Sequence, residues 1–272
     1  MVNTPGKAPR VGLFVTCLVD LFRPGIGFAS IKLLERAGCE VEVPAAQTCC
    51  GQPAFNSGDY GTSRRIARQV IEAFESFDYI VGPSGSCMST IRAHYRDLFE
   101  DDPQWLERAN RLSERVYELL SFLTDVMDID GVDAEYRGIA TYHDSCSGLR
   151  ELGVKSQPRK LLGSVAGFSL NEMNDCEVCC GFGGTFCVKY PEISTRMVTD
   201  KVGSIEASGA DTLVGGDLGC LMNMSGRLSR LDQRVKVYHA AEILANMADG
   251  PGIGEAEDAG RGAAPDRGRG QG

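Results

Sequence analysis

Two adjacent cysteines followed by glycine occur twice in this chain of 272 residues, about 130 positions apart. The first stretch reads CCGQPAFNSG at 49–58, and the second reads CCGFGGTFCV at 179–188. Thiolates bind soft metals or carry out redox chemistry, although a free cysteine is often only a small buried hydrophobic residue. A thiol pair that recurs with its glycine favours metal binding or redox chemistry.

Each pair has another cysteine before it and another after it, at nearly matching distances. These distances are 32 and 37 residues in the first half of the chain, and 33 and 40 in the second. Burial does not require the same spacing twice, so the spacing indicates two groups of four thiols. The groups are Cys17, Cys49, Cys50 and Cys87 in the first half and Cys146, Cys179, Cys180 and Cys220 in the second.

These cysteines follow segments with the pattern of β-strands. In the first half the segments are VGLFVT (11–16), EVEVP (40–44) and DYIVGPSGSC (78–87); in the second they are GIATYHDSC (138–146), GFSLNEMND (167–175) and DTLVGGDLGC (211–220). Helical spacing alternates with them over 28–38, 57–76 and 191–208, and LRELGVKSQPRKLLG favours one helix or two short ones. Strands, cysteines and helices follow one another in the same order in both halves, which indicates an internal duplication. In addition, RVYELLSFL (115–123) resembles VKVYHAAEIL (235–244).

The alternation predicts an α/β fold of two repeated halves, each a small parallel sheet flanked by helices. We expect the halves at 8–128 and 137–248, joined by the acidic segment MDIDGVDAEYR (127–137). Residues 249–272 are rich in glycine and lack apolar periodicity, which predicts a disordered tail. In a parallel sheet, the loops that leave the carboxyl ends of the strands open on one edge, so each group of four thiols should lie at such an edge.

Four thiolates from three loops suit zinc or an iron–sulfur cluster. Adjacent cysteines point in opposite directions in an extended chain, so reaching one site requires a turn that Gly51 or Gly181 can provide. The glycines also let backbone N–H groups approach cluster sulfurs, which raises the reduction potential. Cys87 and Cys220 are expected near helix N-termini, where the helix dipole favours the thiolate.

The remaining cysteines and the histidines have weaker signals. Cys39, Cys176 and Cys187 have no counterpart in the other half and are expected to be buried hydrophobic residues. Cys176 also forms Cys-x-x-Cys with Cys179, which makes it an alternative ligand. His143 lies three residues before Cys146, close enough to hydrogen-bond a cluster or relay a proton. His94 and His239 are expected to be structural.

Composition excludes several classes of function. A net charge of −9 and a pI near 5.0 argue against a nucleic-acid partner, and no glycine-rich motif of a nucleotide site is present. No apolar run approaches the roughly 20 residues that span a bilayer. Lys7 and Arg10 before VGLFVTCLVDLF imitate a signal peptide, but Asp20 interrupts the run and no cleavage site follows. We expect a cytoplasmic protein, where 11 cysteines indicate metal or redox chemistry rather than disulfides.

Several long stretches resemble a known family. They are CLVDLFRPGIG, QTCCGQPAFNSGDYG, GPSGSC, YHDSCSGLRELG, CCGFGGTFCVKYPEIS and CLMNMSGRL, which run from about residue 11 toward 248. They resemble the cysteine-rich CCG domain family, whose domain is duplicated in one of the subunits of heterodisulfide reductase and in iron–sulfur subunits of glycolate and glycerol-3-phosphate oxidation systems. Within it, the chain is similar to the lactate utilization protein A group.

The resemblance implies a cytosolic subunit of a three-part system that oxidises L-lactate to pyruvate. It implies iron–sulfur or thiol redox chemistry, with a [4Fe–4S] cluster in each half as the leading expectation and the eight repeated cysteines as ligands. It also implies two partners, a ferredoxin-type iron–sulfur subunit and a third subunit.

Two departures from the wider family bear on this expectation. The heterodisulfide reductase relatives end each repeat in Cys-x-x-Cys, whereas Thr90 and Asn223 stand where the last cysteine would be. The chain also lacks the ferredoxin run of the glycolate-oxidising subunits, so it needs a partner to form a chain of clusters. A thiol–disulfide catalyst and a structural zinc-binding module remain as alternatives.

Overall fold

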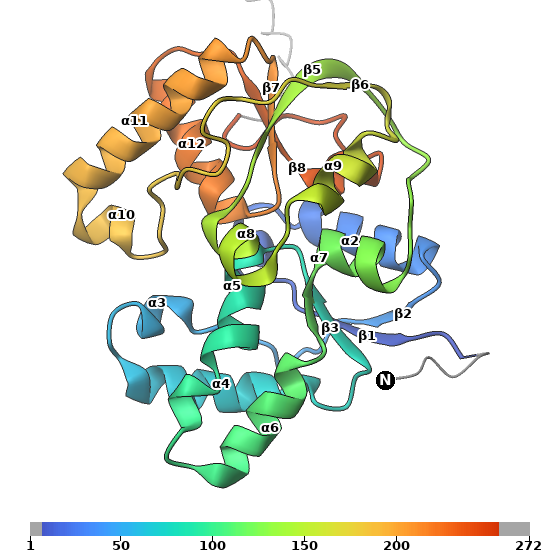
Figure 1. Ribbon diagram of the computed structural model, residues 1–272, viewed down its shortest axis with the longest axis vertical. Helices are drawn as coiled ribbons and strands as arrows, with labels where there is room; N and C mark the ends of the chain where they lie inside the picture. Colours follow the sequence, from blue (N-terminus) through green and yellow to red (C-terminus); the bar gives the residue numbers. More distant parts are fainter. Residues whose placement is uncertain (1–6, 256–272) are drawn as a thin grey trace, which may run out of the picture.

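Two four-stranded parallel sheets form the centre of the protein (Figure 1), in a computed structural model that describes residues 7–255. The first sheet has the order β2-β1-β3-β4 and the second the order β6-β5-β7-β8. The first contains β1 (Arg10–Leu13), β2 (Glu40–Glu42), β3 (Tyr79–Gly82) and β4 (Val116–Glu118); the second contains β5 (Glu135–His143), β6 (Ala166–Leu170), β7 (Thr212–Gly215) and β8 (Lys236–His239). The predicted duplicated α/β fold is confirmed.

The strand register explains why both sheets need helices on their faces. Val11 of β1 pairs with Val41 of β2 and with Tyr79 of β3, and every pairing in both sheets is parallel. Parallel strands require crossover connections, which place helices over the sheet. All four residues of β7 are buried, as expected of a strand covered on both faces.

Helices and helical turns connect the strands. The first half contains α1 (Cys17–Phe22), α2 (Gly25–Arg36), α3 (Gln52–Phe55), α4 (Tyr60–Phe74), α5 (Gly85–Ser89), η1 (Thr90–His94), η2 (Asp97–Phe99), α6 (Pro103–Ser113), α7 (Leu119–Ser121) and η3 (Phe122–Val126). The second contains α8 (Cys146–Leu152), α9 (Ser156–Leu162), α10 (Phe186–Lys189), α11 (Pro191–Ala207), α12 (Leu218–Arg230) and α13 (Ala240–Leu244). The segment expected as one helix or two short ones forms two, α8 and α9.

The two longest helices show how closely the halves correspond. The buried positions are Ser63, Ala67, Val70, Ile71 and Phe74 in α4 and Ser194, Val198, Lys201, Val202 and Ile205 in α11. The spacing is the same in both, and it is the spacing of one helix face packed on a core. Four of the five positions keep a similar character, but Lys201 occupies the place of Val70.

The two halves pack against each other through their helices. In Figure 1, α5 and α8 meet at the centre of the molecule and α7 lies beside α9; α2 also packs against α13. One hydrophobic cluster contains Val11 and Leu13 of the first sheet together with Leu213 and Val237 of the second. The shared core therefore fixes the position of one half relative to the other.

The chain after α13 differs from the expected tail. Residues 249–255 pack on β8: the N–H of Ile253 donates to the carbonyl of Val237 at 2.7 Å, and the Tyr238 hydroxyl donates to the carbonyl of Gly250 at 2.6 Å. Ile253 is buried, so the prediction of disorder from residue 249 is wrong for this part. The packing of residues 249–255 could not be predicted from their composition, because the segment contains few apolar side chains. It is held in place by Ile253 and by hydrogen bonds of its backbone. Residues 256–272 of the expected tail lie outside the described residues.

The second sheet begins at Glu135, two residues before the expected start of its half.

Candidate metal centres

The single cysteines of each half lie at the carboxyl edges of the strands, at the beginnings of helices. Cys17 and Cys146 are the first residues of α1 and α8. Cys87 and Cys220 are each the third residue of their helices, α5 and α12. Cys87 and Cys220 therefore lie near helix N-termini, as expected. Corresponding cysteines of the two halves also occupy the same position within their helices.

The two cysteine pairs have the same backbone geometry. Gly51 and Gly181 adopt φ values of 86° and 83°, the left-handed region that suits glycine. Each glycine N–H points back to the first sulfur of its pair, with a nitrogen–sulfur distance of 3.4 Å to Cys49 Sγ and of 3.4 Å to Cys179 Sγ. A Cβ on Gly181 would come within 2.9 Å of the Ser194 carbonyl oxygen. The expected turn and the expected N–H group near sulfur are both present.

Neighbouring thiols interact in the same order in both halves. In the first half, hydrogen bonding with the Cys49 thiol, followed by burial, raises the pKa of Cys17. Hydrogen bonding with Cys17 and Cys50 lowers the pKa of Cys49 to about 3. Interaction with Cys49 and Cys87, followed by burial, raises the pKa of Cys50. The four sulfurs thus form one continuous group that runs from Cys17 to Cys87.

The second half repeats this arrangement from Cys146 to Cys220. Hydrogen bonding with Cys179, followed by burial, raises the pKa of Cys146. At Cys180, hydrogen bonding with Cys179 lowers the pKa, but interaction with Cys220 and burial outweigh it and the pKa is raised. At Cys220, hydrogen bonding with Cys180 lowers the pKa, but burial and the charge of Asp217, with smaller effects of Cys146 and Cys179, together outweigh it and the pKa is raised. Metal ligation needs thiolates, so binding at either group would release protons.

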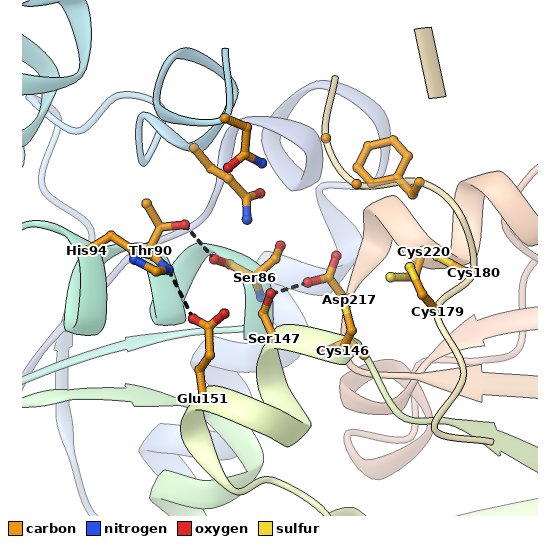
Figure 2. A pocket seen from close by; sticks show the side chains of 16 residues that line it. Ser86, Thr90, His94, Cys146, Ser147, Glu151, Cys179, Cys180, Asp217 and Cys220 are labelled. Atoms are coloured by element: carbon orange, nitrogen blue, oxygen red, sulfur yellow. Dashed lines mark hydrogen bonds and ion pairs between the residues drawn. The ribbon is translucent and has the colours of Figure 1, made fainter. Parts of the chain in front are cut away.

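The two groups lie beside adjoining cavities of about 210 Å³ each. Cys17, Cys49, Cys50 and Cys87 line one cavity, and Cys146, Cys179, Cys180 and Cys220 line the other, which Figure 2 shows. Ser86, Phe182 and Asp217 line both cavities and form part of the wall between them. The second cavity extends to the His94–Glu151 pair, whose nitrogen–oxygen distance is 3.2 Å.

Asp217 joins the halves at this wall, a role that the sequence did not reveal. It is buried, and its Oδ2 accepts hydrogen bonds from the Ser84 hydroxyl at 3.1 Å and from the Ser86 N–H at 2.9 Å. Ser84 in turn accepts from the N–H of Cys87 at 3.2 Å. In the sequence, the only indication of a role for Asp217 is its position after a strand and before a helix. Its hydrogen-bond partners, Ser84 and Ser86, belong to the other half and could not be inferred from that position.

His143 lies beside the second thiol group. It ends β5, is 1 % exposed, and one of its ring nitrogens lies within 4.8 Å of the sulfurs of Cys180 and Cys220. Neither ring nitrogen has a well-formed hydrogen bond among the residues described. Burial lowers the pKa of His143 to about 3, and the nearby charge of Lys201 acts in the same direction, against a weak contact with the Cys176 backbone.

The three unrepeated cysteines lie outside these groups. Cys39 is buried beside Met127, and burial raises its pKa to about 11. The Cys187 thiol contacts the carbonyl of Gly184 at 3.6 Å. Cys176 is partly exposed, and its carbonyl accepts from the ammonium of Lys201 at 3.5 Å. All three remain free thiols, as do the other eight cysteines.

The donor set of each half fits zinc or an iron–sulfur cluster. Every group offers four free thiols, and a thiolate set of this kind is typical of zinc or iron–sulfur clusters. The glycine N–H groups that point at sulfur also suit a cluster.

Glu118, at the end of β4, is a buried carboxyl near the junction of the halves. Its Oε2 accepts from the N–H groups of Leu120 and Ser121 at 2.9 and 3.0 Å, and its Oε1 has no partner among the described residues. Burial raises its pKa to about 8; the two N–H bonds oppose this, and the charge of Asp217 adds to it.

Glu118→Gln should flatten the pH dependence of stability. Because the folded pKa is about 8 and the ordinary value is 4.5, the folded protein retains a proton that the unfolded chain loses as the pH rises between these values. The free energy of unfolding of the wild type should therefore fall by roughly 2–5 kcal/mol across that range relative to the variant. Urea unfolding followed by Trp105 fluorescence measures it. The exposed Glu114→Gln should follow the wild type, and a wild-type slope in Glu118→Gln would contradict the assignment.

Two repeated α/β halves, each with four thiols at its strand edge, define a duplicated cysteine-rich domain protein. The cysteine-rich domain family CCG matches residues 11–92 and 140–225. Lactate utilization protein A of Bacillus cytotoxicus is 48% identical over 235 residues, which cover 86% of this chain and 98% of that protein. The protein of the same name from Bacillus subtilis is also 48% identical over the same shares. The chain belongs to the lactate utilization protein A family.

A solved structure shows the same fold at low identity. The crystal structure of a hypothetical protein from Helicobacter pylori matches with a TM-score of 0.63 and 11% identity. The match covers 91% of this chain and 50% of that one, so this chain spans half the length of that protein. No helix among residues 7–255 combines the length and the apolar character needed to cross a membrane.

Proposed function

We propose that this chain is a cytoplasmic redox subunit of a multi-protein system that oxidises L-lactate to pyruvate. The observation that carries the proposal is the pair of matched four-thiol groups at the strand edges, in a chain of the lactate utilization protein A family. The eleven free thiols are consistent with a reducing compartment.

The eight repeated cysteines are the proposed ligands of one iron–sulfur centre in each half, with [4Fe–4S] as the expected type. Such a centre, when bound, accepts and releases one electron at a time. The N–H groups of Gly51 and Gly181 stabilise negative charge on the sulfurs of Cys49 and Cys179, since each lies 3.4 Å away. Burial of Cys50 and Cys180 limits contact with water, and this also sets the potential.

Two adjoining centres suit the electron count of the reaction. Oxidation of L-lactate to pyruvate releases two electrons and two protons, and the electrons must leave through carriers. The cavities beside the two thiol groups share Ser86, Phe182 and Asp217 as lining residues. Asp217 hydrogen-bonds the first half through Ser84 and Ser86, which keeps the two groups in a fixed relation.

The proposed partners are a ferredoxin-type iron–sulfur subunit and a third protein of the same system. The chain has no ferredoxin run of cysteines, so electrons need a further carrier. Large apolar side chains are exposed beside the cysteine loops, where a carrier would have to dock. They are Leu21 and Phe22 on α1, Val178 next to Cys179, and Val188 and Tyr190 at α10.

Thiol–disulfide chemistry is the second candidate function. Its support is Cys49, whose pKa is lowered to about 3 by hydrogen bonding with Cys17 and Cys50, because a thiolate is the attacking species in disulfide exchange. An anaerobically purified protein distinguishes the two. A brown protein that absorbs near about 400 nm supports the iron–sulfur function, and a colourless, metal-free protein that reduces a model disulfide supports the second.

The isolated chain, fully loaded with metal, should show no L-lactate oxidation. L-lactate-dependent reduction of a dye should appear only when the ferredoxin-type and third proteins of the system are added. The assay compares the complete mixture, the mixture without this chain, and this chain alone. Turnover by the single chain, or equal turnover by the mixture that lacks it, would contradict the proposed role.

A further inference from the structure

The two thiol groups differ in one buried side chain that faces only the second. His143 lies at the end of β5 with 1 % exposure, and its imidazole is within 4.8 Å of the sulfurs of Cys180 and Cys220. Among the residues described, neither ring nitrogen has a well-formed hydrogen bond, and the one recorded contact is a weak one with the Cys176 backbone. An imidazole buried without partners costs free energy unless something else occupies its nitrogens.

His239 shows how the same fold satisfies a buried histidine that is structural. It ends β8 and is fully buried; its Nε2 lies 3.2 Å from the Pro83 carbonyl, and its Nδ1 accepts from the N–H of Ala241 at 3.1 Å. Both nitrogens of His239 are thus used by the backbone. The free nitrogens of His143 therefore do not follow from burial alone.

We propose that the second half can also hold a single metal ion, bound by a ring nitrogen of His143 together with the sulfurs of Cys180 and Cys220. A metal that holds two sulfurs and one nitrogen in a tetrahedral arrangement places them about 3.5–3.8 Å apart. A group whose members lie within 4.8 Å of one another reaches this spacing with small side-chain movements. The inference rests on metal binding in the second half, which is part of the proposed function, but not on that metal being iron.

The first half offers no nitrogen at the matching place. Phe14, three residues before Cys17 as His143 is before Cys146, is fully buried in the hydrophobic core. Lys201 adds to the difference, because this buried lysine of α11 takes the place of Val70 of α4. A nearby positive charge raises the reduction potential of an iron–sulfur centre, and Lys201 lies near Cys179 and Cys180. The second centre should have the higher potential.

The test uses protein made with ¹⁵N-labelled histidine and loaded with Co²⁺ alone, so that it works whichever metal the protein normally holds. Pulsed EPR of the cobalt distinguishes a directly bound nitrogen, which gives a strong hyperfine coupling, from a hydrogen-bonded one, which gives a weak coupling. The chain has only three histidines. His94→Gln and His239→Gln should both keep the strong coupling, which assigns it to His143 without altering that residue.

His143→Phe, which copies Phe14, should lose the coupling and weaken Co²⁺ binding in the second half at least about tenfold. A weak coupling only, no Co²⁺ binding, or a strong coupling that disappears in His94→Gln or His239→Gln would overturn the inference. Failure of the iron–sulfur function is a separate outcome: the iron-treated protein would then show no cluster signal, while the cobalt protein would still show bound nitrogen.

Discussion

Cys50→Ser should lower the metal bound per chain by about half and leave the second centre occupied. Cys50 is buried in the first thiol group and interacts with Cys49 and Cys87, so serine removes one ligand and leaves a buried hydroxyl. Cys180→Ser should give the mirror result, and the double variant should bind little metal. Each single variant should also unfold more readily, because metal binding and folding are coupled. Metal per chain, measured by elemental analysis on anaerobic preparations, gives the answer.

The matched control is Cys39→Ser. Cys39 is also buried, but it lies beside Met127 and away from both groups. This variant should keep its full metal content and lose roughly 1–3 kcal/mol of stability, the cost of burying an unsatisfied hydroxyl. Two independent four-cysteine sites are contradicted if Cys39→Ser loses as much metal as Cys50→Ser, or if either single variant at Cys50 or Cys180 loses all of it.

Deleting the gene should abolish growth on L-lactate as sole carbon source and spare growth on glucose or pyruvate. The expectation follows from the family and from the proposed redox role, since electrons from lactate would have no route out. A strain without another lactate dehydrogenase is needed, because a second enzyme would conceal the loss. Growth curves on the three carbon sources measure the effect.

Complementation connects this phenotype to the thiol groups. The wild-type chain and Cys39→Ser should restore growth on L-lactate, whereas the Cys50→Ser, Cys180→Ser double variant should not. Normal growth of the deletion strain on lactate would count against the function. Full rescue by the double variant would show that the family role does not need the eight-cysteine arrangement.

The sequence was sufficient to predict the fold class and the grouping of the cysteines. Both depend on local spacing: strand patterns that end at cysteines, and helix faces such as those of α4 and α11. A parallel sheet sends its carboxyl-end loops to one edge, so Cys17 and Cys87 had to approach the first pair once the strands were assigned. The glycine turns at Gly51 and Gly181 followed from the same reasoning.

The sequence was not sufficient where residues of the two halves meet. Asp217 accepts bonds from Ser84 and Ser86, more than 130 positions away in the chain, and no local pattern encodes that pairing. The short strands β4 and β8 were visible only as resembling segments, because no cysteine loop follows them to mark the pattern. The ring nitrogens of His143 lack well-formed hydrogen bonds because of how the core packs around them. That packing involves residues far apart in the sequence.

The most direct test of the central claim is the iron and acid-labile sulfide content of the anaerobically purified wild-type chain, read together with its EPR spectrum after reduction. Iron and sulfide should be present in equal amounts, sufficient for one [4Fe–4S] centre in each half, and the spectrum should show signals from two reducible centres. Stoichiometric zinc without sulfide, or a protein that carries no metal and gives no EPR signal, would contradict the central claim.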